Sequence, residues 1–157
     1  MSFSSTLKIN ASGLTAQRLR MDVIANNLAN VNTTRTDEGG PFKRKLVVFR
    51  PMNKPNPFID INSLTSYSTR ILGPQDVDEY LQGVKAVQIT DDQTQGKLSY
   101  EPGHPDANEE GYVEYPNINV VTEMVDMISA SRSYEANVTA ISTTKAMAIK
   151  ALEIGRA

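Results

Sequence analysis

The sequence contains no cysteine and no tryptophan, and its single histidine is His104. The absence of cysteine excludes disulfide bonds and thiolate catalysis. The sequence also lacks a run of about 18 apolar residues, so we expect no transmembrane helix. Its N-terminus has no basic segment followed by an apolar block, and we therefore expect no cleaved secretory signal. The 157 residues suffice for one domain with a hydrophobic core.

The formal net charge is small, −2, but the two ends of the chain differ in sign. Residues 1–50 carry eight basic and three acidic side chains, whereas residues 101–157 carry four basic and nine acidic ones. A slightly acidic chain attracts nucleic acid poorly, so we expect no nucleic-acid partner. The asymmetry has two interpretations: a solvated surface, or attraction between the two ends, within one chain or between neighbouring copies.

All eight prolines lie between Pro41 and Pro116, which leaves both terminal segments free to form uninterrupted helices. The sequence therefore predicts an α+β chain. Long N- and C-terminal helices are expected to form a coiled-coil-like core, with a small β-rich domain between them. The expected boundaries are residues 1–36 for the N-terminal helix region, 37–118 for the middle domain and 119–157 for the C-terminal helix region.

Apolar residues recur in the N-terminal segment at the spacing of a helix-packing seam. One row repeats every seven residues and contains Leu7, Leu14, Met21 and Leu28. A second row has the same spacing and contains Phe3, Asn10, Gln17, Ile24 and Val31. The two rows alternate at three and four residues, which predicts a helix over Ser4–Asn30.

The C-terminal segment has clear helix boundaries. Pro116 ends the preceding strand, Asn119 is a suitable N-cap, and Gly155 is a suitable end. Between these boundaries, spacings of three or four residues connect Val121, Met124, Ile128, Ser131, Tyr134, Val138, Ile141, Lys145, Ala148 and Leu152. The pattern predicts one helix that runs to Ile154.

The middle of the sequence is rich in β-branched residues, glycine and proline, which indicates short strands joined by turns. Residues 51–82 have no steady period and hold four prolines, so we expect a flexible loop, or one that only a partner orders. The expected strands are Lys43–Arg50, Gly83–Thr90, Lys97–Pro102 and Tyr112–Tyr115, with a turn at residues 91–96.

The two helices carry more apolar surface than the chain can cover. Even after they pair, Ile9, Ala16 and Val23 on the first and Met127 and Ile149 on the second are expected to face outward. Long helices with uncovered apolar faces indicate an assembly of several copies. The subunit-interface residues that we predict are Leu7, Leu14, Met21, Ile24, Asn27, Leu28, Val31, Met124, Ile128, Tyr134, Val138, Ile141 and Leu152.

Four asparagines lie within residues 23–32, inside an apolar helical frame. Asparagine is a mediocre helix former and is costly to bury without partners. An amide at a helix interface is satisfied only when its partner is in register, so it rejects misaligned pairing at some loss of stability. We hypothesise that Asn27 and Asn30 fix the register between neighbouring subunits.

Candidates for catalysis or metal binding are few. His104 lies in a Gly/Pro-rich segment that also contains three carboxylates, those of Asp106, Glu109 and Glu110. This combination is compatible with a metal site or an acid–base pair, but it suits a tight turn better. The sequence contains no nucleophile motif and no phosphate-binding loop. We therefore expect no catalytic, cofactor-binding or metal-binding residues, and no enzymatic activity.

Three longer stretches resemble the flagellar axial proteins of bacteria, which are the subunits of the rod and hook. Residues 12–34, SGLTAQRLRMDVIANNLANVNTT, resemble the N-terminal signature of this family. Residues 123–137, EMVDMISASRSYEAN, resemble its C-terminal signature. The link YEPGHPDANEEGYVEYPNINVVTEM, residues 100–124, resembles that of proximal-rod subunits.

One departure from the family pattern narrows the assignment. Many rod and hook proteins follow the Asn-Thr pair with a glycine and an aromatic residue, whereas here Thr33 is followed by Thr34, Arg35 and Thr36. This difference is acceptable in a proximal-rod subunit and disfavours the distal rod and the hook.

The resemblance implies that terminal helices of neighbouring subunits pack into a tubular core, with the middle domain outside. It implies a structural subunit of the proximal rod that transmits torque from the rotor to the distal rod and hook and supports motility. The implied partners are other copies of the chain, proximal and distal rod subunits, the hook–basal-body adaptor at the rotor ring and the flagellar type III export apparatus.

The implied location is the basal-body rod where it crosses the periplasm. The chain is expected to reach it without a cleaved signal peptide and without membrane insertion. The residues alone leave an alternative open, namely a soluble helical hairpin that serves as an adaptor or as an export-chaperone-like binding module.

Overall fold

The computed structural model describes residues 3–52 and 83–155. Helix α1 spans Phe3–Ala29, and helix α3 spans Val120–Ile154. Between them come four strands: β1 Lys45–Pro51, β2 Val84–Asp91, β3 Lys97–Tyr100 and β4 Tyr112–Tyr115. The loop predicted for residues 51–82 lies outside the described residues, apart from Pro51, which ends β1, and Met52.

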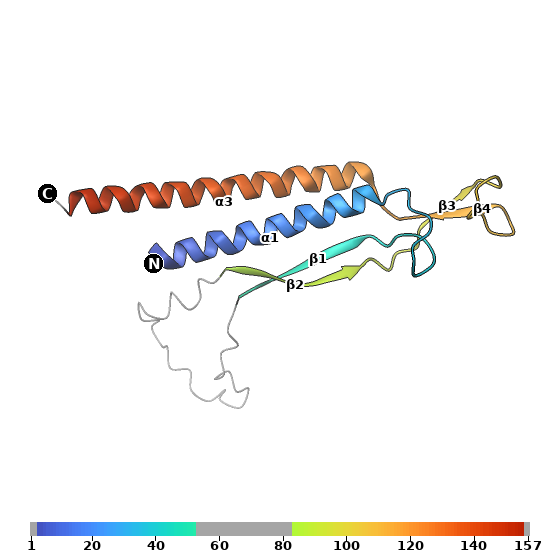
Figure 1. Ribbon diagram of the computed structural model, residues 1–157, viewed down its shortest axis with the longest axis horizontal. Coiled ribbons are helices and arrows are strands. Elements are labelled where there is room, and N and C mark those ends of the chain that lie inside the picture. The colour runs from blue at the N-terminus through green and yellow to red at the C-terminus, as the bar shows by residue number, and fades with distance from the viewer. Residues whose placement is uncertain (1–2, 53–82, 156–157) are drawn as a thin grey trace, which may run out of the picture.

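The two helices lie side by side and run antiparallel, and the β1–β2 ribbon lies along the other side of α1 (Figure 1). The β3–β4 hairpin projects beyond the helix pair, at the end where α1 finishes and α3 begins (Figure 1). Each pair of strands forms its own two-stranded antiparallel sheet. This arrangement confirms the predicted α+β fold, with long terminal helices and a small β-rich part between them.

The boundaries of α3 agree with those predicted from the sequence. The side-chain oxygen of Asn119 accepts hydrogen bonds from the backbone N–H groups of Val121 at 3.0 Å and Thr122 at 3.3 Å, as an N-cap does. At the other end, the N–H of Gly155 donates to the carbonyl oxygen of Ala151 at 3.1 Å. The helix therefore begins and ends where local groups satisfy its free backbone atoms.

Small and polar side chains line the contact between the two helices. On α3 they recur every seven residues and are Glu123, Ala130, Asn137 and Thr144. Opposite Asn137 lies Gly13 of α1, so close that a Cβ on this glycine would stand 3.0 Å from Asn137 Nδ2. Residues as small as Gly13 and Ala130 let the helix axes approach closely.

The side of α1 that the sequence predicts to face solvent is buried, which corrects that expectation. Ala16 and Val23 are only 4% and 8% exposed. They lie three and ten residues after Gly13, on the side of α1 that faces α3. Two further residues expected to face outward, Ile9 and Met127, are half-buried. The seven-residue spacing thus identifies the helix but not its innermost side.

The β1–β2 ribbon is fixed to α1 at both ends. At one end Asn27 Nδ2 donates to the Lys45 carbonyl oxygen, and Asn27 Oδ1 accepts from the Lys45 N–H, both at 2.9 Å. At the other end the Val84 N–H donates to Ser12 Oγ at 3.0 Å, and a Cβ on Gly83 would overlap this oxygen. Ser12 and Asn27 are about 22 Å apart along α1, a distance that matches the roughly 20 Å length of β1.

The β3–β4 hairpin is attached to the loop that follows α1. The Thr34 hydroxyl donates to Asp106 Oδ2 at 2.8 Å, and the Arg35 guanidinium lies 3.8 Å from Asp106 Oδ1. Within the hairpin, the rings of Tyr100 and Tyr112 pack edge to face with their centroids 5.3 Å apart. An isolated two-stranded hairpin is marginally stable in water, so these contacts hold its turn in place.

We predict that Ala130→Leu destabilises the helix pair. Ala130 is completely buried in the seam, so a larger side chain must push the helices apart, which lowers stability by about 1–3 kcal/mol. Urea unfolding followed by far-UV circular dichroism measures the loss. Ala136 is exposed on the same helix, and Ala136→Leu is the control, with an expected change within about 0.5 kcal/mol. Equal stability of the two variants would contradict the close approach of the helices.

Candidate subunit interface

One buried carboxylate joins both helices and the ribbon. Glu123, in the first turn of α3, is 1% exposed. Its Oε1 accepts a hydrogen bond from Arg44 Nε at 2.7 Å and lies 2.6 Å from Arg44 Nη2, and its Oε2 accepts from Asn27 Nδ2 at 3.1 Å. Arg44 immediately precedes β1, and Asn27 lies near the end of α1. A carboxylate is tolerated in the interior only with such partners.

The asparagines of α1 form hydrogen bonds within their own chain. Asn27 is 1% exposed, and its amide bonds to Lys45 and Glu123. It therefore fixes the register between segments of one chain, whereas a role between subunits stays a prediction. Asn30 also bonds locally, to a carbonyl oxygen and a hydroxyl group close to the end of α1. Amides inside the apolar frame are explained by the backbone and carboxylate groups that they satisfy.

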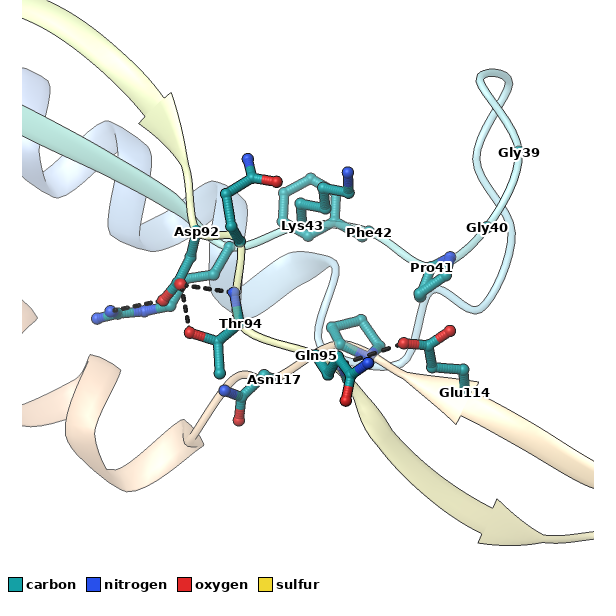
Figure 2. A pocket seen from close by; sticks show the side chains of 14 residues that line it. Gly39, Gly40, Pro41, Phe42, Lys43, Asp92, Thr94, Gln95, Glu114 and Asn117 are labelled. Atoms are coloured by element: carbon teal, nitrogen blue, oxygen red, sulfur yellow. Dashed lines mark hydrogen bonds and ion pairs between the residues drawn. The ribbon is translucent and has the colours of Figure 1, made fainter.

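A surface hollow of about 250 Å³ lies beside this cluster, where the loop at residues 39–41, the turn after β2 and the end of β4 meet (Figure 2). Asp92 accepts hydrogen bonds from the Thr94 hydroxyl at 2.6 Å and the Thr94 N–H at 3.0 Å, which hold the pKa of Asp92 below its ordinary value. Glu114 Oε1 accepts from the Gly96 N–H at 3.2 Å. Since both carboxylates have partners within the chain, we interpret the hollow as a junction between loops.

The segment around His104 forms a turn. The His104 N–H donates to the Glu101 carbonyl oxygen at 3.0 Å, and His104 Nδ1 accepts from the Asp106 N–H at 3.1 Å. These bonds support the interpretation of His104 as a turn residue. Within residues 3–52 and 83–155, no three His, Asp or Glu side chains gather as metal ligands. In the same part of the chain, neither helix combines the length and the apolar character needed to cross a membrane.

The predicted interface residues fall into three groups by exposure. Four are between 44% and 70% exposed, namely Met124, Ile128, Val138 and Leu152. Seven are half-buried, namely Leu7, Leu14, Met21, Leu28, Val31, Tyr134 and Ile141. The remaining two, Ile24 and Asn27, are buried. Only the first group offers a large free apolar surface to a neighbouring molecule.

Further exposed apolar side chains on α3 lie outside the predicted interface. They are between 47% and 78% exposed and comprise Val121, Val125, Met147, Ile149 and Ile154. They gather at the two ends of the helix, in the stretches VVTEMV and MAIKALEI. Apolar residues in these stretches occupy more than one side of the helix, and this density is the signal that a search for a single row overlooks.

Six exposed side chains of α3 lie on one side of the helix, and we call this set the apolar flank: Val121, Met124, Ile128, Val138, Ile149 and Leu152. Their spacings of three, four, ten and eleven residues bring them to one side. The neighbouring exposed side is small or polar in the middle of the helix, with Ser129, Arg132, Ala136, Thr139 and Thr143, and carries the exposed apolar residues Val125, Met147 and Ile154 at the helix ends. Covering the exposed half of one large apolar side chain contributes about 1 kcal/mol, so the apolar flank favours association with another molecule.

Two family models match the ends of the chain. Residues 7–35 match the family described as flagella basal body rod protein, and residues 109–154 match the family described as flagellar basal body rod FlgEFG protein C-terminal. The first match covers most of α1, and the second covers β4 and all of α3. The matched segments therefore include Asn27, Glu123 and the whole apolar flank.

Curated relatives match the chain over nearly its whole length. Three of them, from three bacteria, are named flagellar basal-body rod protein FlgC. The chain is 46% identical over 158 residues to that of Borreliella burgdorferi, with 98% of each chain covered. It is 45% identical over 155 residues to that of Bacillus subtilis, with 96% of this chain and 97% of the relative covered. It is 38% identical over 156 residues to that of Escherichia coli O6:H1, with 99% and 100% covered.

We predict strong coupling between Arg44 and Glu123. Arg44→Met leaves a buried carboxylate without its cation, which lowers stability by about 3–5 kcal/mol. Adding Glu123→Gln removes the stranded charge, so the double variant should recover part of this loss. Urea titrations of the four proteins give the coupling energy. Arg18 is exposed on α1, and Arg18→Met serves as the control. Strictly additive losses would show that the ion pair does not join the two segments.

Proposed function

The chain belongs to the FlgC family of flagellar basal-body rod proteins, and we propose that its copies build the proximal part of the rod through the apolar flank. It is a structural subunit of the basal body and assembles there with other rod components. The observation that carries the proposed contact is the apolar flank itself, a row of exposed apolar side chains along α3. In water such a row along a 35-residue helix favours burial against another molecule.

The three exposure groups of the predicted interface have different parts in this proposal. Met124, Ile128, Val138 and Leu152 belong to the apolar flank, and we expect them to reach a neighbouring subunit. We expect the half-buried residues Leu7, Leu14, Met21, Leu28, Val31, Tyr134 and Ile141 to widen the contact with the edges that remain free. Ile24 and Asn27 are buried and stabilise the single chain.

Torque transmission agrees with the way in which the elements are joined. The Asn27–Lys45 and Ser12–Val84 hydrogen bonds hold the ribbon on α1. Glu123 of α3 connects both the ribbon and α1 to α3. A load applied to one of these elements passes to the others through hydrogen bonds and a buried ion pair. We propose that the subunit is a stiff link between the rotor and the distal rod and hook.

We extend the proposal to the partners and to the route of assembly. The expected partners are other copies of the chain, proximal and distal rod subunits, the hook–basal-body adaptor at the rotor ring and the flagellar type III export apparatus. Passage through an export channel requires a chain that unfolds readily. The absence of cysteine and the small side chains of the seam both favour easy unfolding. We propose delivery to the periplasmic part of the rod without a cleaved signal peptide or membrane insertion.

The relatives are structural proteins, and we propose that this chain likewise has no catalytic activity and needs no cofactor. The hydrogen bonds of His104 give it a role in the turn between β3 and β4. The alternative of a soluble adaptor or export-chaperone-like module is disfavoured, because relatives that span the whole chain are rod proteins.

We predict that Ile128→Asp prevents rod assembly while the single chain folds normally. Ile128 is 54% exposed, so the new carboxylate meets water in the single chain but loses water in the assembly, which is costly. In cells that carry only this variant, rods and motility should be lost. Electron microscopy of isolated basal bodies and swimming in soft agar measure both effects. Urea unfolding of the purified variant should change by no more than about 0.5 kcal/mol.

The matched control for this variant is Thr143→Asp. Thr143 is an exposed polar residue of α3 outside the apolar flank, so this substitution should leave rods intact. Normal rods from Ile128→Asp would contradict the apolar flank as the interface. Loss of rods from both variants would instead extend the contact around the whole exposed surface of α3.

A further inference from the structure

Two cationic side chains lie opposite each other at one end of the β1–β2 ribbon. In the strand register, Arg50 of β1 lies directly opposite Lys85 of β2. Both side chains are exposed, and within residues 3–52 and 83–155 neither forms an ion pair. Like charges directly opposite one another in an antiparallel pair are destabilising. We call this pair, Arg50 and Lys85, the basic ribbon end.

The described segments around the basic ribbon end carry no opposite charge. Residues 3–21, 43–52 and 83–90 contain no Asp or Glu. Gly83 packs on Ser12, which brings the N-terminal half of α1 beside this end of the ribbon. Lys8 adds a further exposed cation on that half of the helix. An uncompensated positive surface of this kind attracts an acidic one.

The turn of the β3–β4 hairpin presents the opposite charge. Glu109 and Glu110 are consecutive and exposed, and neither carboxylate forms an ion pair within the described part of the chain. The Asn108 side-chain oxygen accepts from the N–H groups of Glu110 at 3.1 Å and Tyr112 at 2.8 Å, and Gly111 follows with φ of 83°. These bonds order the backbone of the turn, from which the two glutamate side chains project. We call this pair, Glu109 and Glu110, the acidic tip.

The basic ribbon end and the acidic tip lie far apart along the long axis of the molecule. The hairpin projects beyond the start of α3, whereas the ribbon end that holds Arg50 and Lys85 lies beside the N-terminal half of α1 (Figure 1). The two surfaces cannot meet within one chain. A contact between two different surfaces of identical copies does not close into a two-fold dimer, and it generates a ring or an open helical assembly.

We propose that in the rod the acidic tip of one copy docks on the basic ribbon end of the next copy. This head-to-tail contact sets the order and register of the copies. The inference rests on the proposed function, because it requires that copies of the chain polymerise. Exposed ion pairs are screened by salt and each contributes little adhesion. The apolar flank therefore supplies the adhesion, and the charged contact selects the correct neighbour.

Two other occupants of the basic ribbon end are possible outcomes of a test. The first is the segment 53–82 of the same chain, which contains the acidic residues Asp60, Asp76, Asp78 and Glu79. The second is a different rod protein with an acidic surface. A second copy is favoured because the acidic tip projects from an ordered turn, has no ion-pair partner among the described residues and lies far from the basic ribbon end of the same molecule.

Disulfide cross-linking tests the contact directly. The chain has no cysteine of its own, so a disulfide between two copies can form only through the introduced cysteines. The full-length chain with Lys85→Cys and Glu110→Cys replaces the unmodified chain in cells, and isolated basal bodies are oxidised. We expect a series of dimers, trimers and larger multimers on non-reducing gels, since each copy reaches one neighbour at each end. Each single-cysteine variant should give dimers at most.

The matched control for the cross-link combines Glu110→Cys with Arg132→Cys. Arg132 is an exposed basic residue of α3 outside the apolar flank, so this pair should give no series of multimers. Assembled basal bodies that give no multimers with the Lys85 and Glu110 pair would overturn the contact. A cross-linked product with the mass of this chain plus a different protein would also overturn it.

Charge reversal gives a second, independent test. Arg50→Glu with Lys85→Glu, and separately Glu109→Lys with Glu110→Lys, should each lower the number of rods per cell at least about tenfold, since like charges then face each other. The chain with all four substitutions should recover most of the rods. No recovery would assign the basic ribbon end to residues 53–82 or to another rod protein, and would overturn the contact.

The two proposals can fail separately. If the charge-reversed variants assemble normally while Ile128→Asp does not, the head-to-tail contact is wrong and the proposed function stands. If Ile128→Asp also assembles normally, the proposed function itself fails at the apolar flank.

Discussion

The buried carboxylate of Glu123 is the group on which the arrangement of this chain depends. The Asn119 cap places it in the first turn of α3, where it meets Arg44 and Asn27. Asn27 in turn bonds to the backbone of β1 at Lys45. Loss of any one of these groups leaves a buried polar atom without its partner, which is expensive in a low-dielectric interior. Specific polar bonding, more than the extent of apolar burial, therefore defines the fold of the single chain.

Polar specificity inside the molecule is accompanied by apolar surface outside it. In most amphipathic hairpins the largest apolar side chains lie between the helices. Here Gly13 and Ala130 occupy that position, whereas Ile128 and Leu152 face solvent. This distribution supports the proposal that neighbouring copies complete the apolar core. A chain that buries these side chains only on assembly gains part of its stability there.

Local chemistry was enough to predict the elements but not the faces that they bury. Asn119 and the end of α3 agree with the prediction, as does β4, and the other strands are displaced by one or two residues. A seven-residue spacing does not say which of two adjacent rows lies innermost when a ribbon also packs on the helix, so Ala16 was misplaced. Asn27 and Glu123 are 96 residues apart, and no local pattern brings them together.

The two separate attachments of the ribbon have a mechanical consequence. With one attachment the ribbon would swing about it as about a pivot, and with side-chain packing alone it would slide along α1 under shear. Ser12 and Asn27 instead hold the ribbon near both of its ends. Their separation of about 22 Å acts as a lever arm against rotation in the plane of contact. Outer ribbon and helical core must therefore turn together, whichever way the shaft rotates.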